Sequence, residues 1–193
     1  ALVIQLHGRL ACWRGAGGDS AKAKATTIGE AHASAIALAH RSVPVALDLA
    51  GFRDDRDAVI EGLVDGTIDC IASDHAPHPE EDKDCEFDQA PAGMIGLETT
   101  VGLVKTYLID KGYLDWADAI RKMTSNPARI FGLPGGTLSK GSPADITIID
   151  AEKKWTVRAD KFRSRSQNSP FIGYKLSGQV TKTILGGRVV FEL

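Results

Sequence analysis

The side chains best suited to chemistry in this chain lie in one heptapeptide, residues 72–78, Ala-Ser-Asp-His-Ala-Pro-His. An aspartate can ligate a metal ion or carry a proton, and an imidazole can hold an anionic substrate. Taken singly, Asp74, His75 and His78 can each be structural, because an Asp side chain in a loop often bonds only to nearby backbone amides. Together, two histidines close behind one aspartate favour metal-assisted hydrolysis.

The elements before the heptapeptide predict where it lies in a fold. The run 67–71, Thr-Ile-Asp-Cys-Ile, is short and rich in β-branched residues, which predicts a mostly buried strand. Before it, apolar residues at helical spacing predict a helix with Asp54 or Asp55 as N-cap and Gly66 as its stop. A helix followed by a buried strand is the unit of a parallel α/β fold, which places its chemistry at the C-terminal ends of strands.

Downstream of the heptapeptide, the pattern changes from helix to strand. Residues 79–93 form a long polar loop, which is uncommon unless functional and would overhang the strand end. Helices are predicted over 97–111, from an Asp115 cap to Thr124, and from an Asn126-Pro127 start to Gly132. Strands are predicted over 145–149, 155–157, 176–184 and 188–192, with Gly186-Gly187 as a hairpin turn.

Composition narrows the class of protein. The 193 residues can bury a sizeable core but fall short of a complete (β/α)8 barrel, which takes about 250. The net charge of −2, with acidic and basic residues interspersed, argues against a nucleic-acid surface or a polybasic membrane anchor. Three cysteines without CxxC spacing suit a reducing cytosol. With no apolar stretch of about 18 residues and no signal-peptide pattern, we expect a cytoplasmic protein.

The heptapeptide also resembles a known family signature. Residues 73–78, followed by Lys83, resemble the second signature of dihydroorotases, zinc amidohydrolases of pyrimidine synthesis. Hydantoinases and allantoinases share the aspartate but generally not the Ala-Pro-His that follows. The likeness covers about three quarters of the chain, from about Asp54 to Leu193, and continues through residues 84–88, 90–99, 125–132, 144–146, 155–157, 168–171 and 186–190.

The resemblance implies an α/β fold with two parts. Residues 51–140 would be the C-terminal portion of a (β/α)8 metal-dependent hydrolase barrel, and residues 141–193 part of a small flanking β-domain. Residues 1–50 are rich in alanine and glycine and match nothing familiar from dihydroorotases, so they are unassigned, either disordered or partly helical. This break suggests a truncated, rearranged or frame-shifted gene.

The resemblance also implies roles for four residues. The counterpart of Asp74 ligates zinc and shuttles the proton from the hydroxide to the departing nitrogen as dihydroorotate becomes N-carbamoyl-aspartate. The counterpart of His78 grips the substrate carboxylate, and the backbone matching Ala92 and Gly93 contacts the substrate. Each has a structural alternative, and Gly93 can simply serve a turn. His75 has no metal role in the family, so we expect it to be structural.

The other metal ligands of the family are missing from this sequence. No His-x-His occurs, and residues 3–9 keep only His7 and Arg9 of the family's Asp-x-His-x-His-x-Arg. His32 and His40 do not share a close helix face for zinc. Because zinc sites use at least three protein ligands, we predict that the chain alone hydrolyses dihydroorotate poorly or not at all.

Two alternatives stay open. In one, the chain is a non-catalytic dihydroorotase-like protein that acts by association, as a homo-oligomer or with a completing chain, because half a barrel exposes sheet edges. In the second, the chain is a different cyclic amidase, such as a hydantoinase. The tripeptide Ala76-Pro77-His78 argues against this alternative.

Overall fold

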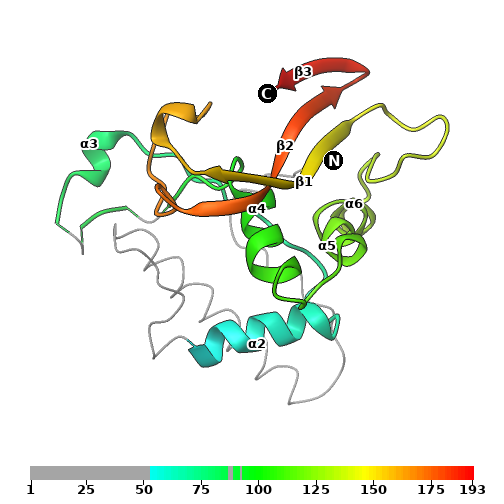
Figure 1. The fold of residues 1–193 in the computed structure, drawn as a ribbon, viewed down its shortest axis with the longest axis horizontal. Coiled ribbons are helices and arrows are strands. Elements are labelled where there is room, and N and C mark those ends of the chain that lie inside the picture. Colours follow the sequence, from blue (N-terminus) through cyan, green and yellow to red (C-terminus); the bar gives the residue numbers. More distant parts are fainter. Residues whose placement is uncertain (1–52, 87–88, 92) are drawn as a thin grey trace.

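The computed structural model describes residues 53–86, 89–91 and 93–193 (Figure 1). Its longer helices precede a three-stranded sheet, so the described chain mixes helix and strand, as expected for an α/β protein. The unassigned segment 1–50 and Ala92 lie outside the described residues. The division into two domains at residue 140 stays a prediction. Among the described residues, no helix is long and apolar enough to cross a membrane.

The sheet is antiparallel with strand order β1-β2-β3. β1 spans Ile146–Thr156, β2 spans Lys175–Leu185 and β3 spans Arg188–Glu192. The predicted hairpin turn is confirmed, since Gly186 and Gly187 join β2 to β3 with φ of 55° and 78°, as a type I′ turn requires. The two strands predicted over 145–157 form one continuous β1, because shifts of register let the strand bend without leaving its partner.

Two predicted helix ends are confirmed by their caps. α5 spans Trp116–Met123, and the side chain of Asp115 accepts a hydrogen bond from the backbone N–H of Asp118 at 2.7 Å. α6 spans Ser125–Phe131 and ends at Gly132, whose φ of 63° is left-handed. Glycine adopts that conformation without the steric cost of a Cβ, which is why the helix stops there.

Two predicted helix starts are wrong. α2 spans Arg53–Val64, so Asp54 and Asp55 lie inside its first turn instead of capping it. α6 begins before Asn126, whose amide Nδ2 donates to the carbonyl oxygen of Asp69 at 2.9 Å. The Asn126 side chain, which the local pattern predicts as a helix cap, therefore bonds to a backbone carbonyl far away in the sequence.

The strand predicted over 67–71 does not form as such. Residues 69–74 have no regular secondary structure, and Ile68 lies in a single bridge. The run is held by α5 instead, because Lys122 Nζ donates to the Ile68 carbonyl at 2.7 Å and the Ile71 N–H donates to the Lys122 carbonyl at 3.0 Å. A strand needs partners for its backbone groups along its whole length, and the described residues do not supply them here.

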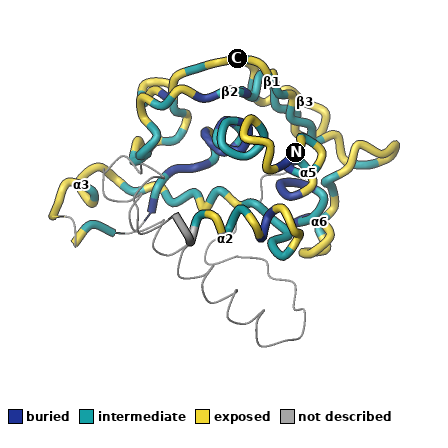
Figure 2. Tube along the Cα trace, turned by 60° about the horizontal axis from the view of Figure 1, so that its bottom comes forward, coloured by how far each residue is buried: buried dark blue, intermediate teal, exposed yellow. Residues whose placement is uncertain are grey.

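The core lies between the helices and the sheet, where buried segments face one another (Figure 2). α4 spans Thr100–Val104 and packs against β2, whose Leu176 is only 2 % exposed. Gly102 permits this approach, because a Cβ at that position would lie 3.0 Å from Leu176 Cδ1. A second buried cluster is formed by Val104, Leu114, Ala119 and Met123.

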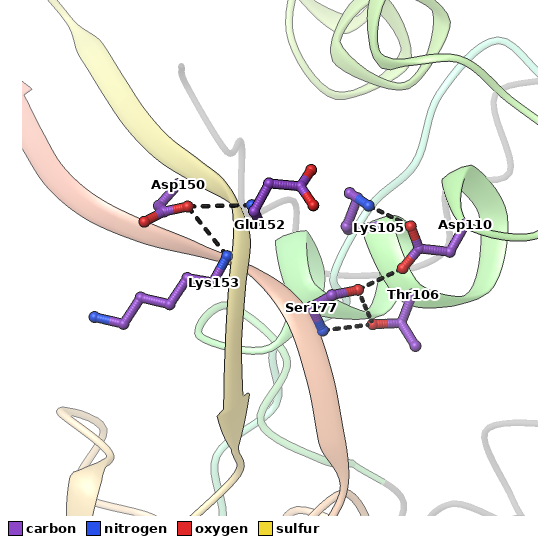
Figure 3. A network of polar contacts seen from close by, with 7 residues as sticks. All are labelled: Lys105, Thr106, Asp110, Asp150, Glu152, Lys153 and Ser177. Carbon is purple, nitrogen blue, oxygen red and sulfur yellow. Dashed lines mark hydrogen bonds and ion pairs between the residues drawn. The ribbon is translucent and has the colours of Figure 1, made fainter.

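The helix predicted over 97–111 forms in two pieces, since α4 continues into a π-helical turn, η1, over Lys105–Ile109. Figure 3 shows the polar contacts that attach η1 to β2. Lys105 is buried and forms an ion pair with Asp110. Asp110 in turn accepts from the Ser177 hydroxyl at 2.5 Å, and the Ser177 N–H donates to Thr106 Oγ1 at 2.9 Å.

Candidate active site

Asp74 stands out by its backbone. Its φ is 44°, and no other non-glycine residue in the described part of the chain has a positive φ. Its side chain is exposed, and it makes no hydrogen bond or ion pair with the described part of the chain. Left-handed backbone costs an L-residue free energy, and such residues are enriched at functional sites. The carboxylate is thus exposed on a residue whose backbone is strained.

His75 joins two segments of the chain. It forms a parallel bridge with Met94, and its Nδ1 accepts from the backbone N–H of Gly96 at 3.1 Å and, at 3.5 Å, from that of Leu97. An Nδ1 that accepts hydrogen bonds carries no proton, so the proton of the neutral ring lies on Nε2. Burial lowers the pKa of His75, and the nearby Glu98 carboxylate partly opposes that shift. These contacts support the expected structural role.

The structure brings two of the predicted substrate-contacting residues together. Gly93 is buried with φ of 146°, and a Cβ on it would lie 2.5 Å from His78 Nε2 and 2.8 Å from the Ala76 Cβ. No side chain fits in that space, so the Gly93 backbone lies directly against the imidazole of His78. Ala92, the fourth predicted site residue, lies outside the described residues.

The predicted loop over 79–93 contains a short helix, α3, over Glu80–Lys83. Lys83 is half-buried and donates from Nζ to the carbonyl of Pro91 at 2.5 Å, which ties the two sides of the loop together. Desolvation lowers the pKa of its ammonium group. Cys85, in the same loop, is exposed. Lys83 therefore supports the shape of the loop and does not point to chemistry.

One contributor to the site carried no assigned role in the sequence. Asn168 lies in the connection between β1 and β2, over 157–174, which also contains the short helix η2, Ala159–Lys161. Its Nδ2 donates to the carbonyl oxygens of Gly93 at 2.9 Å and Ala76 at 3.3 Å. Asn168 lies in residues 168–171, one of the segments that resemble dihydroorotases, and this was the only hint of a role in the sequence. Its partners lie too far away in sequence to be deduced.

The described residues do not fit a zinc ion by themselves. Within them, no three His, Cys, Asp or Glu side chains gather closely enough to hold a metal. Asp74 offers one carboxylate, whereas zinc sites in proteins use at least three protein ligands.

Comparison with known proteins gives the family. The profile of the Amidohydrolase family matches residues 20–190, beginning inside the segment left unassigned. A dihydroorotase of Endomicrobium trichonymphae is 52% identical over 142 residues, covering 73% of this chain and 34% of that protein. A dihydroorotase of Pelotomaculum thermopropionicum is 56% identical over 138 residues, covering 72% and 32%. The resemblance to dihydroorotases is confirmed, and the chain spans about a third of the length of these relatives.

Solved structures agree on the fold. An L-hydantoinase (dihydropyrimidinase) from Arthrobacter aurescens superposes with a TM-score of 0.67 at 36% identity, over 72% of this chain and 32% of that one. A D-hydantoinase from a Thermus species superposes with a TM-score of 0.66 at 25% identity, over 73% and 32%. By its sequence and by its partial-length structural match, this chain belongs to the amidohydrolase family.

Proposed function

We propose that this chain is the C-terminal part of a dihydroorotase-type hydrolase, a (β/α)8 barrel with a small β-domain, acting in the cytoplasm on dihydroorotate. The reaction is hydrolysis of a cyclic amide to N-carbamoyl-aspartate, or its reversal. The observation that carries the proposal is the packing of Gly93 against His78, a residue that follows the exposed Asp74 within the same heptapeptide. Identities of 52% and 56% to dihydroorotases support the substrate class.

Each site residue has a task that its surroundings permit. Ring opening requires a proton at the departing nitrogen, and the exposed carboxylate of Asp74 can carry it. His78 binds the carboxylate of the substrate, and the backbone at Ala92 and Gly93 contacts the rest of the ring. The absence of a side chain at Gly93 lets this backbone lie directly against the His78 imidazole.

Zinc is the expected metal, with Asp74 as the ligand that this site supplies. Since the described residues hold no group of three ligands, the remaining ones would have to come from other residues or from a partner chain. We therefore propose that the chain alone turns over dihydroorotate poorly. Stoichiometric zinc together with robust turnover by the purified 193-residue protein would contradict this part of the proposal.

A chimera tests the function directly. The segment of the Pelotomaculum thermopropionicum dihydroorotase that aligns over 138 residues is replaced by the matching segment of this chain, and turnover of dihydroorotate is measured. We expect activity in the chimera, its loss on Asp74→Asn, and its retention on Asp82→Asn, a matched exposed carboxylate in α3. A folded, zinc-loaded chimera without activity, or one insensitive to Asp74→Asn, would refute the proposal.

A second function, non-catalytic association with another chain, is favoured by the absence of a three-ligand group among the described residues. Size-exclusion chromatography separates it from the first, because a compact, inactive monomer would exclude association as the mode of action. A hydantoinase activity is the third candidate, since structural matches include hydantoinases. A panel with hydantoin, dihydrouracil and dihydroorotate as substrates for the chimera decides between the two cyclic amidases.

A further inference from the structure

The side chain of Asn168 uses its full hydrogen-bonding capacity on the candidate site. An amide has two donor hydrogens and an acceptor oxygen with two lone pairs. Both donors go to backbone carbonyls, of Gly93 at 2.9 Å and of Ala76 at 3.3 Å. The oxygen accepts from the Ser166 hydroxyl and, at the long distance of 3.5 Å, from the His78 N–H. A single side chain thus bonds to the backbone just before the 79–93 loop and at the last residue of that loop.

The surroundings of Asn168 hold it in this orientation. The Ser166 hydroxyl, whose single hydrogen serves one acceptor at a time, also lies 2.7 Å from the carbonyl oxygen of His78, and Ser166 is buried. The backbone carbonyl of Asn168 accepts from the Ile95 N–H at 3.1 Å. Earlier in the same connection, the backbone N–H groups of Arg163 and Ser164 donate to the carboxylate of Glu98 at 2.9 Å and 3.1 Å. The β1–β2 connection is therefore fastened over the site at two places.

We infer that Asn168 is a positioning residue that holds His78 and Gly93 against each other so that together they bind an anionic substrate. This inference rests on the proposed function. The Gly93 backbone lies so close to the imidazole that not even a Cβ would fit between them. Asn168 spans the gap from the sheet side, which makes the β-rich part of the chain a component of substrate binding.

Replacement by aspartate separates positioning from packing. Asn168→Asp keeps the shape of the side chain but removes both donors and sets a negative charge against the carbonyls of Gly93 and Ala76. Asn168→Ala removes the bonds without adding charge, and serves if the aspartate variant fails to fold. Gln167→Ala is the matched control, because Gln167 is the exposed neighbour in the same connection.

The experiment uses the full chain with 13C- and 15N-labelled histidine and glycine. Two readouts are taken: the nuclear Overhauser effect between the His78 ring and Gly93, and the affinity for N-carbamoyl-L-aspartate followed at the His78 resonances. We expect both Asn168 variants to lose the His78–Gly93 effect and to bind the probe at least tenfold more weakly. The neighbouring His75–Gly96 contact should persist, and Gln167→Ala should match the native chain.

The inference would be overturned if either variant kept the His78–Gly93 effect. It would also be overturned if Asn168→Ala lost the His75–Gly96 contact as well, because Asn168 would then be a general structural residue. Failure of the proposed function gives a different result. In that case the native chain does not bind N-carbamoyl-L-aspartate, while loss of the His78–Gly93 effect in the variants still supports the positioning role.

Discussion

The backbone N–H of Gly96 donates to Nδ1 of His75 across 3.1 Å, and this bond joins the heptapeptide to the segment that follows the polar loop. Gly96 itself is buried, and a Cβ on it would lie 2.5 Å from the carbonyl oxygen of Ser73. The neutral imidazole is required as an acceptor, because a protonated ring presents two donors. The alignment of the site therefore depends on the ionisation of a residue that takes no part in the proposed chemistry.

We expect the free energy of unfolding to fall at acid pH because His75 becomes protonated. Its pKa is lowered by burial from the ordinary value of 6.5, so the unfolded chain binds the proton more readily than the folded one. Stability contributed by the neutral ring is fully present above about pH 6.5 and is lost as the pH falls through the lowered folded-state pKa. Urea unfolding between pH 5 and 8 measures the effect. In His75→Gln, which cannot titrate, this pH dependence should disappear, and its persistence would contradict the assignment.

Relieving the strain at Asp74 should stabilise the chain. Asp74→Gly places at φ 44° a residue that adopts this conformation freely, and we expect a gain of about 0.5–1 kcal/mol in the free energy of unfolding. The same change in the chimera should abolish turnover, because the carboxylate is lost. Asp84→Gly is the control, since Asp84 is exposed with an ordinary φ of −84° and should gain nothing. Equal gains at both positions would show that strain at Asp74 is not the cause.

Adding a methyl group at Gly93 should damage the site more than strain alone does. Gly93→Ala forces a Cβ into contact with His78 and Ala76, while Gly66→Ala suffers only a φ of 82° with no atom within 4 Å. We expect the free energy of unfolding to fall by about 1–3 kcal/mol more in Gly93→Ala than in Gly66→Ala. Thermal unfolding of both variants measures the difference. Matching losses would mean that the Gly93–His78 contact is not tight in solution.

The ion pair between Lys105 and Asp110 should respond asymmetrically to mutation. Asp110→Asn leaves a buried ammonium group without its carboxylate, and should cost about 1–2 kcal/mol after allowing for the exposure of Asp110 to solvent. Lys105→Met removes the charge and keeps the apolar stem, so a smaller cost is expected. Asp118→Asn is the control, because its ion pair with Arg121 is exposed on both sides and should cost less than about 0.5 kcal/mol. A larger loss in Lys105→Met than in Asp110→Asn would refute this account.

The Asp110 carboxyl also predicts a second acid transition, distinct from that of His75. Hydrogen bonds from Lys105 and Ser177 lower its pKa from the ordinary value of 3.8. Its contribution to stability is complete above about pH 4 and is lost as the pH falls through the lowered value, so Asp110→Asn should flatten the stability profile only in that range. If Asp110→Asn instead flattened the profile near pH 6, the transition assigned above to His75 would not belong to His75.

Structural features that depend on residues close together in the sequence were predictable. The cap at Asp115 and the glycines at 132, 186 and 187 depend on bonds and φ angles within a few residues, and the structure has them where the sequence predicts. The predicted strand over 67–71 and the Asn126 cap failed because their polar groups bond to partners more than fifty positions away. Local patterns cannot report such partners.

By itself the sequence determined the family and the residue types of the candidate site, because the motif from Ser73 to His78 is specific and similar chains carry the name dihydroorotase. Tertiary structure alone decided that Gly93 lies against His78 and that Asn168 holds both. Asn168 is 90 positions from His78, and only the packing of the sheet connection over the loop brings them together. The contact is set by the fold, and no spacing in the sequence encodes it.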